Sequence, residues 1–123
     1  MSLLLDTHVV LWWLADDPGL ADEIKDRIDT ELDVFLSSAT IWEVTIKQAL
    51  GKLGPEDLPE RMSGCDLREL PITARHAIKA GRLPAVHRDP FDRMLIAQAQ
   101  CEGLTLVTRD AEIQKYDVPI LTV

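Results

Sequence analysis

Short apolar runs alternate with longer amphipathic stretches along the chain. Five runs have the length of short buried strands, and they cover Leu3–Leu5, Val34–Leu36, Leu67–Ile72, Leu104–Thr108 and Pro119–Val123. Helical spacing and helix-end signals predict helices over Thr7–Ala15, Pro18–Thr30, Ala39–Leu50, Thr73–Ala80 and Pro90–Glu102, with a weakly helical Glu56–Cys65 and a short helix ending near Tyr116. The alternation predicts an α/β fold, a three-layer α/β/α sandwich with a central parallel sheet of about five strands.

Capping residues set the expected ends of two helices. Ser38 is expected to cap the helix that begins at Ala39. Asp89 and Pro90 suit the N-cap and first position of the last long helix, and Gly103 is expected to end it.

Length and composition point to one domain. A chain of 123 residues with 46% hydrophobic residues fits a single domain over residues 1–123. No apolar run approaches the ~18 residues of a membrane span, and the N-terminus lacks the features of a signal peptide, so we expect a cytoplasmic protein without a membrane segment. Cys65 and Cys101 form no C-x-x-C pair and are expected to be core thiols.

The formal net charge of −8 argues against a large basic surface for nucleic acid. An acidic protein can still act on phosphodiesters where metal ions supply the positive charge. The positions of the acidic residues therefore decide which function is plausible.

Four carboxylates, Asp6, Glu43, Asp92 and Asp110, are expected at one rim of the sheet. Asp6 and Asp110 come just after predicted strands, and the crevice of an open α/β sheet lies at the carboxyl ends of its strands. Glu43 stands in a helix between neighbours expected to be buried, Trp42 among them, so its carboxylate needs a metal or another polar partner.

Each acid also has a structural explanation. Asp6 and Asp110 could cap the helices that follow them, and Asp92 could favour the dipole of the helix that Asp89 caps. The helix dipole could also favour Glu43, although desolvation beside Trp42 would normally cost more than the dipole contributes. Taken together the four are harder to explain, because carboxylates ~5 Å apart repel by roughly 3 kcal/mol at an effective dielectric near 20. We therefore expect a counter-charge, and in its absence at least one raised carboxylate pKa.

The chemistry that fits four acids is metal-assisted hydrolysis. Hard oxygen ligands without neighbouring cysteine or histidine favour Mg²⁺ or Mn²⁺. Such ions can activate water against a phosphodiester and stabilise the leaving oxygen.

Four segments together resemble a known family. Leu4–His8, Ser38–Val44, Asp92–Ala99 and Leu106–Asp110 resemble, in order and spacing, the four acidic motifs of PIN-domain nucleases, and most of all the VapC toxins of prokaryotic VapBC toxin–antitoxin pairs. The resemblance runs from Leu3 to Val123.

The resemblance implies a Mg²⁺- or Mn²⁺-dependent endoribonuclease acting on cellular RNA, a homodimer, and inhibition by a VapB-like antitoxin. It implies that Asp6, Glu43, Asp92 and Asp110 bind metal and that Thr7 and Thr108 support those acids or bound water. His8, Asp89 and Arg93 match a local pattern of one VapC-like subgroup, which assigns them no catalytic role.

Two other functions remain possible from the sequence. A PIN-like domain can be a catalytically weak binding module, although the presence of all four acids argues against this. A haloacid-dehalogenase-like phosphatase would need D-x-D after the first strand, where this chain has His8. His76 and His87 are expected to be solvated, and the cations available for phosphates near the rim are Lys47, Lys52, Arg82, Arg88, Arg93 and Arg109.

Overall fold

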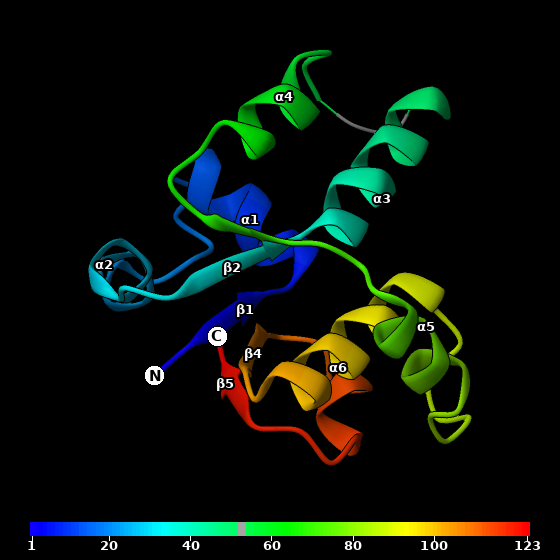
Figure 1. Ribbon diagram of the computed structural model, residues 1–123. Helices are drawn as coiled ribbons and strands as arrows, with labels where there is room; N and C mark the ends of the chain where they lie inside the picture. The colour runs from blue at the N-terminus through cyan, green and yellow to red at the C-terminus, as the bar shows by residue number, and fades with distance from the viewer. Residues whose placement is uncertain (52–53) are drawn as a thin grey trace.

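Five parallel strands form the centre of the computed structural model, which describes residues 1–51 and 54–123. The strands are β1 (Leu3–Leu5), β2 (Val34–Ser37), β3 (Arg68–Leu70), β4 (Thr105–Thr108) and β5 (Ile120–Thr122). Their order in the sheet is β3-β2-β1-β4-β5, so the first strand of the chain is the central one (Figure 1). The parallel sheet expected from the alternating pattern is confirmed.

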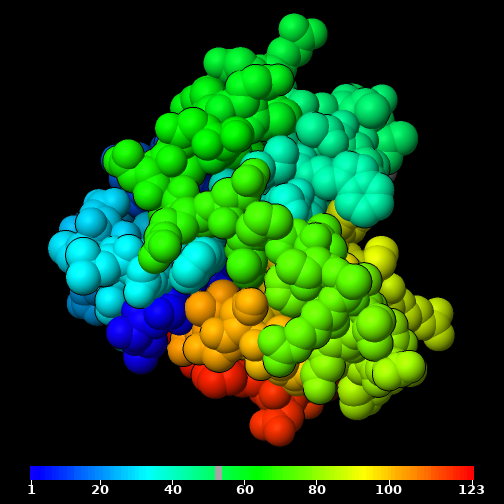
Figure 2. All heavy atoms as spheres, viewed as in Figure 1, coloured from blue at the N-terminus to red at the C-terminus, as the bar shows by residue number. Residues whose placement is uncertain are grey.

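Helices cover both faces of this sheet. They are α1 (Thr7–Leu14), α2 (Asp22–Thr30), α3 (Ser38–Ala49), α4 (Leu58–Ser63), α5 (Ala74–Gly81) and α6 (Pro90–Glu102), with a 3₁₀ turn η1 (Ile113–Lys115). From the side seen in Figure 2, atoms of α3, α4 and α5 hide much of the sheet.

The three layers follow from the alternation of side chains along β1. Leu3 and Leu5 point into a core shared with α1, α2, α3 and α4, whereas Leu4 points into a second core shared with α5, α6 and η1. All three leucines are fully buried. A strand buried on both faces reads as a continuous apolar run, which is why three leucines in succession predict it correctly.

The strand order creates a switch point at β1. The chain builds β2 and β3 on one side of β1 and then crosses over to build β4 and β5 on the other side. Leu3 pairs with Val34 of β2 and Thr105 of β4. Because ligands of open α/β sheets bind outside the carboxyl ends at such a point, the segments after β1 and β4 form the natural site.

Two predicted helix starts need correction. The N-cap of α3 is Ser37 and not Ser38, because Ser37 keeps an extended backbone and its Oγ accepts a hydrogen bond of 3.0 Å from the Ala39 N–H. The second helix begins at Asp22 and not near Pro18, because Asp17 accepts the Gly19 N–H in a turn before it.

The ends of α6 agree with the prediction. Asp89 Oδ1 accepts hydrogen bonds from the N–H groups of Phe91 (2.8 Å) and Asp92 (3.3 Å), and Pro90 occupies the first turn. Gly103 closes the helix at φ +68°, a left-handed conformation that favours glycine.

Some side chains are less buried than predicted. Cys65 and Cys101 are half-buried free thiols and not core residues. Trp42 is 60% exposed, because it lies on the outer side of α3, where its ring meets the Phe91 ring edge-to-face at 5.2 Å. Over the described residues, none of the helices is long and apolar enough to cross a membrane.

Candidate active site

The four acids expected at one rim come from four separate elements. Asp6 is the residue between β1 and α1, Glu43 lies in the second turn of α3, Asp92 in the first turn of α6, and Asp110 two residues after β4. Asp6 and Glu43 are buried, at 5% and 6% exposure, and the Asp92 side chain is 13% exposed. The charge of Asp92 interacts with those of Asp6 and Asp110, and the charge of Asp6 with that of Glu43, so the fold brings all four together.

Thr108 connects two of these acids. Its hydroxyl donates a hydrogen bond of 2.6 Å to Asp6 Oδ2 and accepts one of 3.0 Å from the Asp110 N–H. Thr108 is fully buried at the end of β4, next to β1 in the sheet. A single hydroxyl group therefore fixes the position of Asp6 relative to the backbone of Asp110.

Glu43 has its own partners. Its Oε1 accepts a hydrogen bond of 2.7 Å from the Thr7 hydroxyl, and its Oε2 lies 3.0 Å from Lys47 Nζ, one helical turn away. The expected polar partner is therefore present in the protein. Since Trp42 faces outward, the burial of Glu43 comes from its position on the inner side of α3 and not from that tryptophan.

The capping explanation fails for Asp6 and holds in part for Asp110. The Asp6 backbone is extended at the N-cap position of α1, but across the described residues its side chain makes no capping hydrogen bond. Asp110 Oδ1 accepts the Glu112 N–H at 2.7 Å, while its Oδ2 faces His87. Capping therefore does not explain why a buried acid stands at Asp6, whose carboxylate is bonded by Thr108 instead.

His87 completes the cluster. Its Nε2 lies 2.8 Å from Asp92 Oδ2 and 3.4 Å from Asp110 Oδ2. The backbone N–H of His87 donates to the Tyr116 hydroxyl at 2.8 Å, and its Nδ1 accepts the Asp89 N–H at 3.4 Å. The same ring nitrogen, Nε2, therefore faces both carboxyl groups.

Two carboxyl groups of the site hold protons more tightly than usual. Burial raises the pKa of Asp92 to about 7, and the nearby charges of Asp6, Asp89 and Asp110 add to the effect while His87 opposes it. Burial also raises the pKa of Asp6, against the hydrogen bond from Thr108. The expected raised carboxylate pKa is confirmed, but its leading cause is desolvation; repulsion comes second for Asp92 and is the smallest contribution for Asp6.

These residues fit a divalent metal ion. Ligand atoms of His87, Asp92 and Asp110 lie within 4.8 Å of one another, and the charge of Asp6 acts on Asp92. A hollow of about 330 Å³ lined by Asp6, His8, Val9, Trp12, Arg109 and Asp110 opens beside the acids. Carboxylate oxygens beside a solvent-accessible space are the ligands that Mg²⁺ and Mn²⁺ prefer. The expectation of acids without a neighbouring histidine needs correction, because His87 lies among them.

Comparison with known proteins places the chain in a family. The model of the PIN domain matches residues 3–119. This chain belongs to the PIN domain family. It is 28% identical to Ribonuclease VapC22 of Mycobacterium tuberculosis strain H37Rv over 127 residues, covering 96% of this chain and 94% of that relative.

Solved structures support the fold of this PIN domain. The DNA-bound VapBC complex from Salmonella typhimurium matches with a TM-score of 0.74 at 23% identity, covering 99% of this chain and 98% of that one. FitAcB from Neisseria gonorrhoeae matches with a TM-score of 0.71 at 23% identity, covering 98% and 96% of the two chains. At this level of identity the likeness bears on the α/β/α fold, which is the one predicted.

Two histidines of the PIN domain are not solvated as predicted. His87 is half-buried against the acids, and His76 is 2% exposed because it closes the capping box of α5 with Thr73. His87 lies in the loop before α6, and its place three residues before the first helical residue is the signal that could have found it. Residues in an irregular loop follow no hydrophobic period, so the sequence pattern does not predict the direction in which their side chains point.

Several cations expected to contact phosphates have other partners. Arg93 donates to the carbonyls of Ala80, Leu83, Pro84 and His87. Arg109 donates to the Gly19 and Val123 carbonyls and lies 4.5 Å above the Trp12 ring, and Lys47 pairs with Glu43. Lys52 lies outside the described residues.

Proposed function

We propose that this PIN domain is a metal-dependent endoribonuclease that hydrolyses RNA phosphodiester bonds in the cytoplasm and acts as the toxin of a toxin–antitoxin pair. The observation that carries the proposal is the convergence of Asp6, Glu43, Asp92 and Asp110 at the switch point of the sheet. A ribonuclease of similar sequence over nearly the whole chain supports the choice of RNA. Binding a partner does not require buried acids with raised pKa values, whereas holding a metal ion for catalysis requires such acids close together. We therefore prefer the enzyme to the binding module.

The proposed metal ligands are Asp6, Glu43, Asp92 and Asp110, and the proposed ion is Mg²⁺ or Mn²⁺. When bound, the ion supplies a water of lowered pKa as nucleophile and stabilises the leaving oxygen. The protein's own groups prepare the ligands: Thr108 orients Asp6, and Thr7 together with Lys47 orients Glu43. His87 contacts both Asp92 and Asp110 through its Nε2.

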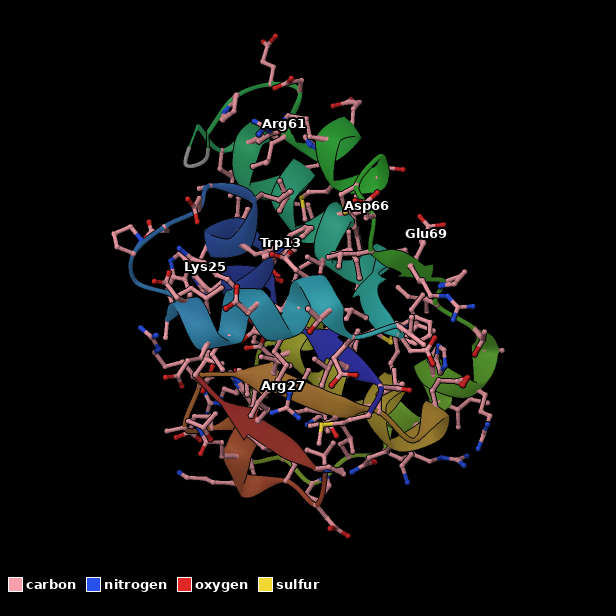
Figure 3. The ribbon with its side chains drawn as sticks, turned by 90° about the vertical axis from the view of Figure 1, so that its left-hand side faces the viewer. Trp13, Lys25, Arg27, Arg61, Asp66 and Glu69 are labelled. Carbon is pink, nitrogen blue, oxygen red and sulfur yellow. The ribbon has the colours of Figure 1, made fainter. Side chains whose placement is uncertain are left out.

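The proposed partner is a VapB-like antitoxin, with the toxin itself a homodimer. A shallow groove of about 210 Å³ between α1 and α4, lined by Leu11, Leu14, Ala15, Pro55, Leu58 and Arg61, suits the apolar face of an amphipathic segment. Trp13, on the same helix as Leu11 and Leu14, is half-buried (Figure 3). Its Nε1 donates a hydrogen bond of 3.0 Å to Asp29 of α2. Structures of related fold were solved as VapBC complexes, which supports an antitoxin partner.

The test is cleavage of a mixed RNA pool with Mg²⁺, with Mn²⁺ and with a chelator. We expect metal-dependent cleavage by the wild type and loss of most activity in Asp6→Asn and in Asp110→Asn, since each change removes a charge at the metal and little packing. Melting curves check that both variants fold. Full activity of either variant with Mg²⁺ present would rule out the four-acid site.

A further inference from the structure

Most lysine and arginine side chains of this acidic PIN domain have a polar partner within the protein. Among the described residues, three cations at α5 and its C-cap have none. Ion pairs occupy Lys25, Arg27, Lys47, Arg68 and Lys115, and carbonyl groups occupy Arg93 and Arg109. Arg75, Lys79 and Arg82 are exposed and, within residues 1–51 and 54–123, have neither an ion pair nor a side-chain hydrogen bond, a state they share with Arg61 and Arg88.

Arg75 and Lys79 lie on one face of α5, and Arg82, the C-cap residue, continues that row. Their spacing of four and then three positions places them on successive turns, where like charges repel. A row of unpaired cations lowers the stability of its own helix unless an anion binds it. In a chain whose net charge is −8, this row is a local patch of positive charge.

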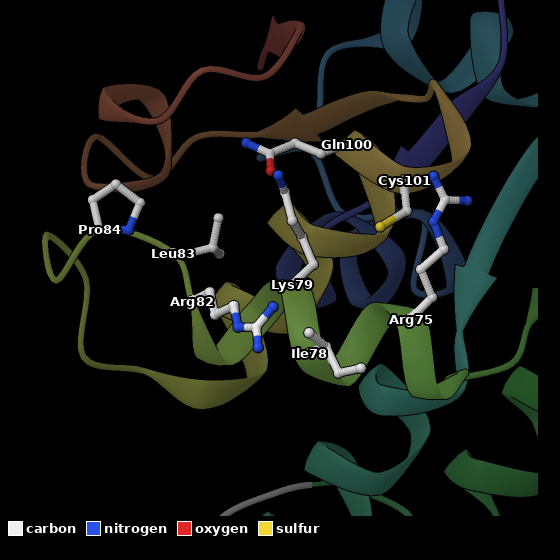
Figure 4. A pocket seen from close by; sticks show the side chains of 8 residues that line it. All are labelled: Arg75, Ile78, Lys79, Arg82, Leu83, Pro84, Gln100 and Cys101. Carbon is white, nitrogen blue, oxygen red and sulfur yellow. The ribbon is translucent and has the colours of Figure 1, made fainter.

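The row borders a hollow. Arg75, Lys79 and Arg82 surround a space of about 710 Å³ between α5 and α6, and Ile78, Leu83, Pro84, Gln100 and Cys101 complete its wall (Figure 4). A groove lined by cations suits a ligand with a row of negative charges, and the phosphates of a single-stranded nucleic acid are such a row.

One end of the hollow lies close to the acids. The loop after Arg82 runs to His87, and the Arg93 guanidinium binds the carbonyls of Leu83, Pro84 and His87. The Leu83–Pro84 end of the hollow is therefore the end nearest to His87, which contacts Asp92 and Asp110. Cys101, nine residues after Asp92 on α6, is about 13 Å further along the helix axis and lies at the far end of the hollow.

We propose that the hollow between α5 and α6 binds the sugar–phosphate backbone of the RNA strand beyond the cleavage site, through Arg75, Lys79 and Arg82. This proposal rests on the proposed ribonuclease function. The wall carries no aromatic side chain within the described residues, so the contact is to the backbone and independent of base sequence.

The test compares two triple variants with the same change in net charge. The first is Arg75→Gln, Lys79→Gln and Arg82→Gln, and the control is Arg27→Gln, Arg68→Gln and Lys115→Gln on other elements. Steady-state cleavage is measured on an RNA of a dozen nucleotides and on the shortest fragment that is still cut.

In the α5 variant we expect KM for the longer RNA to rise about tenfold, with kcat and the short substrate unchanged. The dependence of log KM on log salt should become less steep by about 2, as expected for three phosphates of a single strand. The control variant should behave as the wild type.

Equal KM values in the two triple variants would overturn the proposal. So would an unchanged KM for RNA combined with loss of binding to polyglutamate, which would assign the hollow to an acidic polypeptide. If the wild type cuts no RNA, the proposed function fails. Binding of uncut labelled RNA, measured by fluorescence anisotropy, then tests the RNA-binding role of the hollow separately. Weaker binding by the α5 variant than by the control variant supports that role, and equal binding by the two variants overturns it.

Discussion

One hydroxyl group organises the acids at the scale of single residues. Thr108 bonds both Asp6, 102 positions away in the sequence, and the backbone of Asp110. A hydrogen bond to a charged group contributes about 1.5–3 kcal/mol, and its loss leaves a buried carboxylate less well supported.

We predict that Thr108→Val lowers activity by at least tenfold and lowers the free energy of unfolding by about 1–3 kcal/mol, because the methyl group that replaces the hydroxyl cannot bond Asp6. Thr108→Ser keeps the hydroxyl and should retain most activity. Denaturant unfolding and RNA cleavage measure the two effects, and equal behaviour of the Val and Ser variants would contradict the role given to the hydroxyl.

His87 gives a second prediction at this scale. Groups that orient metal ligands typically change metal affinity by about 10–100-fold when removed. His87→Ala should therefore weaken Mn²⁺ binding, measured by calorimetry, by about that factor, and His87→Gln, which keeps an N–H donor, should recover part of it. Unchanged or tighter Mn²⁺ binding by His87→Ala would show that the imidazole does not position these acids.

Sequence reasoning predicts residues well where the fold fixes them through regular elements. The acids at strand ends and in first helical turns follow from topology, and so does Thr108 as the last residue of β4. His87 and the carbonyl-bound Arg93 do not, because their positions depend on an irregular loop whose path is set by contacts and not by a repeat.

At the scale of elements, α6 links stability to the site. It begins with the Asp89 cap, carries Asp92 in its first turn and ends at left-handed Gly103. Its boundaries were predictable because Asp, Pro and Gly have specific roles at helix ends. The starts of α2 and α3 were not predictable in this way. A turn at Asp17–Gly19 precedes α2, and Ser37 is as suitable an N-cap residue for α3 as its neighbour Ser38.

Asp89→Ala tests the cap. We expect a loss of about 0.5–2 kcal/mol in the free energy of unfolding, because the N–H groups of Phe91 and Asp92 lose their acceptor. Activity should fall only indirectly and remain metal-dependent. Asp89→Asn, another good cap, serves as control and should stay within a few tenths of wild type in stability. Complete loss of cleavage in a well-folded Asp89→Asn variant would instead assign Asp89 to the reaction.

At the scale of the whole molecule, the buried acids couple stability to pH. The pKa of Asp92 is about 7 in the folded state and near 3.8 when unfolded, so the folded state holds its proton more tightly. The resulting stabilisation is complete below the unfolded value and is lost as pH rises through the folded value. Above about pH 7 the ionised cluster therefore opposes folding in the absence of metal.

Melting temperatures measure this coupling. Asp92→Asn has no titrating group at this position. Without metal, the difference between its melting temperature and that of the wild type should therefore grow as pH rises from about 4 to 7. Each kcal/mol of stability lost by the wild type corresponds to a difference on the order of 4 °C. Mg²⁺ should raise the wild-type melting temperature near pH 8 and do progressively less near pH 5, with a smaller response in Asp6→Asn. Equal metal responses in wild type and Asp6→Asn would place the ion elsewhere.

The central place of β1 has a consequence for synthesis. A growing chain that has not yet reached Thr105 has no β4, so β1 lacks one of its two neighbours and Asp6 lacks both Thr108 and Asp110. In a nuclease with this topology, the fragment held by the ribosome cannot assemble its acids. The transcript being translated is therefore not exposed to the activity of its own product until the last strands have emerged.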